Sequence, residues 1–149
     1  MTHQKHLILG ISGEIRNRLV VYRSKQETGE DYFPRIESAR DNLGNVWIPG
    51  QLNGGMLHTK KNLRPGDNLE FIITASDPLG EELEYSIRVH DNHATEWQKN
   101  NIFRVKIEEE HISRNFGILI AIKSKRDYHA SQYSDDSIWF YYTVLPRKK

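Results

Sequence analysis

The chain has 149 residues, which is the usual size of one domain and enough to form a hydrophobic core without disulfides or metals. Charged residues make up 28% of the sequence and the formal net charge is +1, so the overall charge does not favour nucleic acid as a partner. No apolar run approaches the length that spans a membrane, so we expect no membrane partner either.

Cysteine is absent from the sequence. Its absence excludes a disulfide framework, a thiol nucleophile and a cysteine-based metal site. Many extracellular β-sandwiches carry a disulfide, so the absence favours a reducing compartment. The apolar run at residues 7–9 is too short to be a signal-peptide core. We therefore expect a cytoplasmic protein, and a domain taken from a longer chain is the alternative.

Residues 1–31 are rich in apolar side chains but follow no single period. Residues 7–12 and 18–24 could pair as a hairpin around Gly13, which suits a chain that is β elsewhere. A short helix beginning near Ser12 fits the same residues. We expect one of the two as an N-terminal extension that packs on the rest of the chain or forms an interface.

Residues 33–61 predict two short strands, a turn between them and a less regular segment after them. Residues 33–39 form the first, and Pro34 is acceptable there because an edge strand tolerates proline. A turn at 41–45 precedes a short strand at 46–48. Residues 51–61 contain an Asn-Gly-Gly sequence and predict a loop or an irregular edge.

The clearest pattern lies at residues 65–89, which read as turn, strand, turn, strand. A Pro-Gly-Asp turn opens the segment and an Asp-Pro-Leu-Gly turn divides it. On either side of the second turn, apolar and polar positions alternate with the period of a half-buried strand. The inward residues are Leu69, Phe71, Ile73 and Ala75 in the first strand, and Leu83, Tyr85, Ile87 and Val89 in the second.

The sequence PGDNLEFIITASDPLGEELEYSI in this segment resembles the B strand, turn and C strand of immunoglobulin-like domains of the PKD-like and cadherin-like kind. In those domains a Pro-Gly-Asp turn, an Ala-x-Asp-Pro-x-Gly turn and a Leu-x-Tyr strand follow one another. The resemblance implies an immunoglobulin-like β-sandwich from about residue 32 to residue 146, and it implies little about function.

Later strands complete the pattern at residues 102–107, 115–123 and 137–145, and a long polar loop at 124–136 joins the last two. Their inward residues are Phe103, Val105 and Ile107, then Phe116, Ile118, Ile120 and Ile122, then Ile138, Phe140, Tyr142 and Val144. The sequence therefore predicts an all-β fold, an immunoglobulin-like antiparallel β-sandwich of about seven strands over residues 32–149.

The outer face of the last two strands is unusual because it is apolar. As neighbours in one sheet, these strands would place Leu119, Ala121, Trp139 and Tyr141 side by side. A patch of this kind is either covered or used for binding. The N-terminal extension could pack over it, or it could be a protein interface with a second copy or a larger partner. Trp and Tyr are preferred anchors in such interfaces.

Aromatic residues in a loop suggest ligand binding as an alternative to a protein interface. The loop residues Tyr128, His129, Gln132 and Tyr133 form an aromatic and polar group that could contact a carbohydrate or another small ligand. Trp47 and Trp97 are expected instead to plug the ends of the sandwich core.

The residue patterns for a metal site or a catalytic site are incomplete. The turn at Asp77 lacks the dense run of acids typical of calcium sites, and nothing requires His90, His93 and His129 to converge as a zinc site needs. Ser12 lacks the final glycine of a nucleophile elbow. We therefore predict no metal, no cofactor and no enzymatic activity. The leading hypothesis is a non-catalytic protein-interaction module, and an enzyme built on loop histidines is the most distant alternative.

Overall fold

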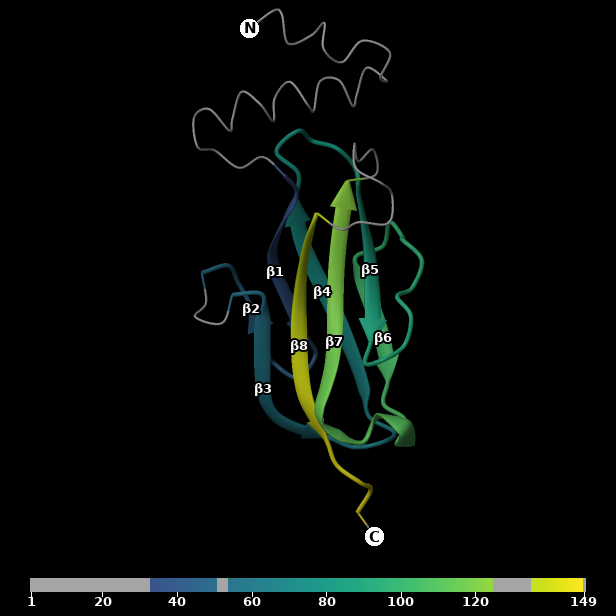
Figure 1. The fold of residues 1–149 in the computed structure, drawn as a ribbon. Helices are drawn as coiled ribbons and strands as arrows, with labels where there is room; N and C mark the ends of the chain where they lie inside the picture. The colour runs from purple at the N-terminus through teal and green to yellow at the C-terminus, as the bar shows by residue number, and fades with distance from the viewer. Residues whose placement is uncertain (1–32, 51–53, 125–134, 149) are drawn as a thin grey trace, which may run out of the picture.

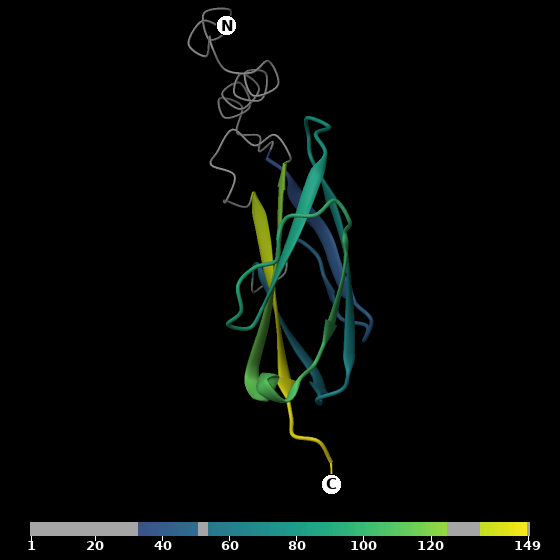
Figure 2. The same cartoon turned by 90° about the vertical axis from the view of Figure 1, so that its right-hand side faces the viewer.

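The computed structural model describes residues 33–50, 54–124 and 135–148. The predicted N-terminal hairpin or short helix lies outside these residues. Two four-stranded sheets face each other as layers (Figures 1 and 2). The strands are β1 Arg35–Asp41, β2 Val46–Trp47, β3 Met56–Leu63, β4 Asn68–Ser76, β5 Leu83–Val89, β6 Ile102–Lys106, β7 Ser113–Ser124 and β8 Asp136–Val144.

The order of the strands is that of an immunoglobulin-like sandwich. One sheet, here the β1 sheet, has the order β2-β1-β4-β6, and the other, the β8 sheet, has the order β3-β8-β7-β5. Strands β1, β4 and β6 therefore lie as strands A, B and E do in immunoglobulin domains, while β5, β7 and β8 lie as C, F and G. The predicted all-β sandwich is confirmed.

Strand β3 differs from the expectation for its residues. The segment predicted as a loop or an irregular edge pairs with β8, and the pairing is parallel, whereas the sequence predicted antiparallel neighbours. It runs from Met56 opposite Trp139 to Leu63 opposite Val144, with an irregularity between His58 and Asn62. The strand was hard to recognise because it lies at the edge of the sheet, where most of its side chains remain exposed and no alternation is required.

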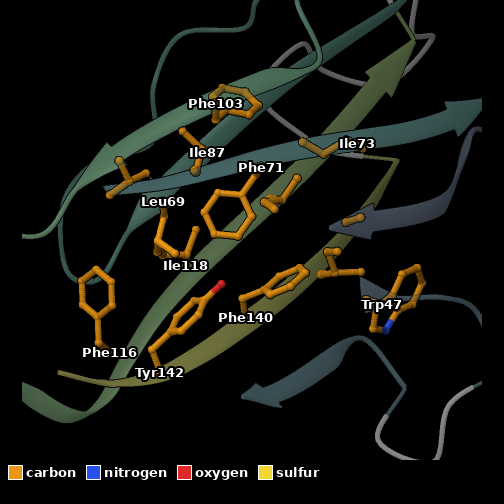
Figure 3. Close-up of a cluster of buried hydrophobic side chains, with 14 of the residues drawn as sticks. Trp47, Leu69, Phe71, Ile73, Ile87, Phe103, Phe116, Ile118, Phe140 and Tyr142 are labelled. Carbon is orange, nitrogen blue, oxygen red and sulfur yellow. The ribbon is translucent and has the colours of Figure 1, made fainter. Parts of the chain in front are cut away.

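The core is formed by the inward faces that the alternation predicted (Figure 3). Phe71 on β4 packs edge-on against Phe140 on β8, with ring centroids 5.2 Å apart. Each fully buried side chain of this size contributes about 1.5–3 kcal/mol to folding. The buried hydrophobic residues of β7 and β8 are those predicted, namely Phe116, Ile118, Ile120, Ile122, Ile138, Phe140, Tyr142 and Val144.

A buried hydrogen bond links the two sheets. The hydroxyl of Tyr142 donates to Asp41 Oδ2 over 2.6 Å. The other carboxylate oxygen of Asp41 accepts from the backbone N–H of Leu43 and of Asn45, so the same carboxylate also fixes the turn after β1. Burial, and then the hydrogen bond to Asp41, raise the pKa of Tyr142 far above its ordinary value. The phenol therefore remains a donor throughout the ordinary pH range.

The free edge of β5 is covered by the segment that follows it. Tyr85 and Gln98 exchange backbone hydrogen bonds, and the backbone N–H of Thr95 donates to the carbonyl of Ile87. The Ser86 hydroxyl donates to the carbonyl of Thr95. The connection between β5 and β6 thus protects this edge from pairing with another chain.

Candidate interaction surface

The outer face of the β8 sheet brings the four predicted interface residues together. Leu119 lies directly opposite Trp139 in the antiparallel ladder of β7 and β8. Tyr141 lies opposite Gly117, and Ala121 lies opposite Ser137. All four side chains are half-buried, in contrast to the fully buried inward faces of the same strands. Their placement agrees with the sequence, and their role as an interface remains a prediction.

A row of three stacked aromatic rings, with a guanidinium over its last ring, crosses this face, and we call it the stacked row. It consists of His58, Tyr141, Trp139 and Arg88. The rings of His58 and Tyr141 are nearly parallel, at 15°, with centroids 5.0 Å apart. Tyr141 and Trp139 stack at 13° with centroids 5.6 Å apart. The guanidinium carbon of Arg88 lies 5.2 Å from the centroid of the Trp139 ring. The row joins β3, β8 and β5 across the sheet.

The sequence pattern missed two members of the stacked row. His58 lies on β3, whose residues predicted no strand, so nothing placed it beside Tyr141. Arg88 alternates correctly with the inward residues of β5 and therefore resembles an ordinary solvent-facing residue. Because arginine side chains often lie over aromatic rings, Arg88 could have been paired with Trp139 from the sequence. That pairing, however, requires knowing that β8, β7 and β5 are neighbours in this order.

Gly117 provides the flat surface under the two large rings. A Cβ atom at this position would lie 3.0 Å from Cε1 of Tyr141 and 3.2 Å from Cζ3 of Trp139. A Cβ at these distances is closer than ordinary van der Waals contact, so the rings would have to shift by a few tenths of an ångström to admit it. The rings therefore lie directly over the backbone of β7.

The guanidinium of Arg88 is incompletely satisfied. Its Nε atom is buried and has no hydrogen-bond partner within the described part of the chain. A cation-π contact with an aromatic ring uses none of the hydrogen-bonding capacity of the guanidinium N–H groups, which stay available as donors. A buried donor without an acceptor costs about 1–3 kcal/mol. Arg88 is thus held by an aromatic ring but has unused capacity to bind an acceptor.

A shallow groove of about 200 Å³ lies beside the stacked row. The groove is lined by Arg88, His90, Asp91, Asn115, Gly117, Trp139 and Tyr141.

One of the lining residues, His90 at the end of β5, has a strained backbone. Its φ is 53°, which is unfavourable for a residue other than glycine. Its backbone N–H donates to the carbonyl of Gly117, and its ring stacks on Phe116 with centroids 5.6 Å apart.

The two other tryptophans differ in their placement. Trp47 belongs to the core, as predicted, and its indole N–H donates to the carbonyl of Gly54. Trp97 does not plug the core. Its ring lies 4.9 Å from Nζ of Lys123, whose side chain alternates with the inward Ile122 and so lies on the outer face of β7. The prediction for Trp97 was wrong because the covering segment carries this residue outside the sandwich.

The other candidate groups do not form a site in the described residues. The carboxylate of Asp77 accepts backbone hydrogen bonds from Leu79 and Glu81, so it holds the turn. No group of three His, Asp or Glu side chains that could hold a metal ion occurs within residues 33–50, 54–124 and 135–148. Nor does this part of the chain contain a helix long and apolar enough to cross a membrane. The predicted ligand loop with Tyr128, His129, Gln132 and Tyr133 lies outside the described residues.

Comparisons with known proteins do not assign a function. No protein-family model matches the sequence, and no curated protein matches it. Among solved structures, a chain described as the extracellular domain of a hybrid two-component system of B. thetaiotaomicron is similar, with 12% sequence identity and a TM-score of 0.42. The match covers 83% of this chain and 16% of that one. A similarity of this size bears on neither function nor location.

Proposed function

We propose that this chain is a non-catalytic protein-interaction module that binds its partner through the outer face of the β8 sheet. The main support is the stacked row, because aromatic and arginine side chains are the groups most enriched at the centres of protein interfaces. Leu119 and Ala121 extend the apolar part of the same face. The partner is another protein or a second copy of this chain.

The arrangement of the rings favours a protein over a carbohydrate on this face. A sugar stacks on an open aromatic face, whereas the rings of Tyr141 and Trp139 are stacked on each other. His58 and Arg88 lie against the same two rings. A partner would therefore meet ring edges, Leu119 and the guanidinium. Carbohydrate or small-ligand binding by the aromatic loop at 128–133 is the second candidate, and binding on a glycan array would support it.

The proposal also includes the kind of β-sandwich and the cellular location. The turn and strand pattern at residues 65–89 supports a sandwich of the PKD-like or cadherin-like kind. The absence of cysteine supports a cytoplasmic location.

Site-specific photo-cross-linking tests the proposed function. A photoreactive phenylalanine analogue replaces Tyr141, and in a matched control it replaces Ile72, which is 38% exposed on the outer face of the β1 sheet. We expect a discrete adduct, with a second copy or another protein, from position 141 and not from position 72. The adduct should disappear when Trp139→Ser is added. Equal adduct yields at both positions, or none at position 141, would contradict the proposal.

A further inference from the structure

The unsatisfied guanidinium of Arg88 indicates which chemical group the partner presents. Arginine is held in place here by Trp139, so its donors have a fixed direction rather than sweeping through solvent. No carboxylate in the described residues forms an ion pair with Arg88. Nε itself is covered, so an acceptor from outside would meet the terminal N–H groups of this partly exposed side chain.

Carboxylate is the acceptor that fits this geometry best. The N–H groups of a guanidinium lie in one plane, and two of them match the two oxygens of a carboxylate in a bidentate pair. The cation is also only half-buried, so a negatively charged group can approach it while remaining partly hydrated. A neutral carbonyl would satisfy one donor and leave the positive charge uncompensated.

The acidic side chain that lines the groove does not act as the acceptor for Arg88. Asp91 is the acidic residue among the lining side chains, and its carboxylate lies 3.4 Å from Nε2 of His90 instead of pairing with Arg88. The side chain of Asp91 is 94% exposed, so it projects away from the surface. Asn115 supplies an amide that can donate to a second oxygen at the groove.

We infer that the groove beside the stacked row takes a carboxylate from an acidic segment of the protein partner, held by the in-plane N–H donors of Arg88. This inference rests on the proposed function of the face. The apolar and aromatic groups contribute contact area, whereas Arg88 selects the partner by charge. The same donor would reject a partner that presents lysine or arginine at this position.

The signal of the Arg88 Nε–H group in a ¹H–¹⁵N correlation spectrum provides a direct test. The full chain is titrated with a tetraglutamate peptide blocked at both ends, then with the matched tetraglutamine peptide, and then with acetate. We expect tetraglutamate to shift the Arg88 Nε–H signal and the Trp139 indole signal in a saturable way. Tetraglutamine should shift neither, and acetate should act only at far higher carboxylate concentrations.

Lysine substitutions provide the matched controls. Arg88→Lys keeps the charge but removes the planar fork, so it should weaken tetraglutamate binding at least about tenfold. Arg104→Lys alters an exposed arginine that pairs with Glu70 on β6 and β4, and it should leave the affinity unchanged. Equal weakening by the two substitutions would show nonspecific charge attraction and overturn the inference.

The remaining outcomes separate this inference from the proposed function. If the titration leaves the Arg88 signal unmoved while position 141 still cross-links, the partner uses the face without a carboxylate and only the inference fails. If acetate and tetraglutamate act equally per carboxylate, the groove is a site for small carboxylates and the acidic segment is wrong. If both the titration and the cross-linking fail, both proposals fall.

Discussion

The hydroxyl of Tyr142 is the polar group that connects the two sheets through the core. Tyr142→Phe removes it without changing the packing, and Asp41 Oδ2 then retains the side-chain amide of Asn45 as its donor. We expect the free energy of unfolding to fall by about 1–2 kcal/mol, measured by urea denaturation. Tyr141→Phe makes the same chemical change on the outer face and should cost less than about 0.5 kcal/mol. Equal effects would mean that the bond to Asp41 contributes nothing.

His111 makes stability depend on pH. Its side chain is buried at the end of the 3₁₀ helix Glu109–His111, its ring packs against Phe116, and its Nδ1 accepts the backbone N–H of Glu108. Burial lowers the pKa of His111 below 6.5, the nearby His90 also lowers it, and the carboxylates of Glu110 and Glu108 oppose the shift. Protonation would in addition destroy the acceptor at Nδ1.

The sign of the effect follows from the lowered pKa. Between the two pKa values the unfolded chain binds more protons than the folded chain, so stability is full above about pH 6.5 and is lost as the pH falls through the folded pKa. Urea denaturation at pH 8 and pH 5 should show this loss. His111→Gln should flatten the dependence, whereas His93→Gln, at an exposed position, should preserve it. An unchanged slope in His111→Gln would contradict the assignment.

At the scale of the element, β7 carries two different faces, and Gly117 determines how the outer one is built. Gly117→Ala would place a methyl group 3.0 Å from Cε1 of Tyr141 and 3.2 Å from Cζ3 of Trp139, so both rings must shift by a few tenths of an ångström. We expect a changed near-ultraviolet circular dichroism signal from Trp139 and, because the rings are only half-buried, a loss of about 1 kcal/mol in the free energy of unfolding. Arg114→Ala, at an exposed position of the same strand, serves as the control and should change neither quantity appreciably.

Alternation identifies strands well where one face is buried and the other is solvated. The inward residues of β4, β6, β7 and β8 were therefore predictable from the sequence. The same reasoning cannot find β3, because an edge strand that exposes most of its side chains need not alternate. Trp139 and Tyr141 were predictable as members of the outer face because they alternate with the inward residues of β8. His58 and Arg88 lie beside these rings only because β3 and β5 belong to the same sheet as β8. The order of strands in a sheet cannot be inferred from the alternation within one strand.

At the scale of the whole molecule, the core and the proposed binding surface lie on opposite faces of the same strands. The inward side chains of β8 hold the two sheets together, while Trp139 and Tyr141 on the same strand face outward. Variants of the outer face can therefore change recognition without dismantling the core. The outer face of the β1 sheet is of an ordinary kind, with the exposed ion pair of Arg104 and Glu70 on it.

The position of β8 has a consequence for how the chain reaches this fold. It lies between β3 and β7 in its sheet, and Thr59 on β3 donates to the carbonyl of Tyr141, 82 positions further along the chain. Contacts between such distant residues slow folding, because a long loop must close before they form. During synthesis, β3 must emerge and wait for β8 before it can pair. Until then its edge stays unpaired, so we expect the β8 sheet to be completed late in folding.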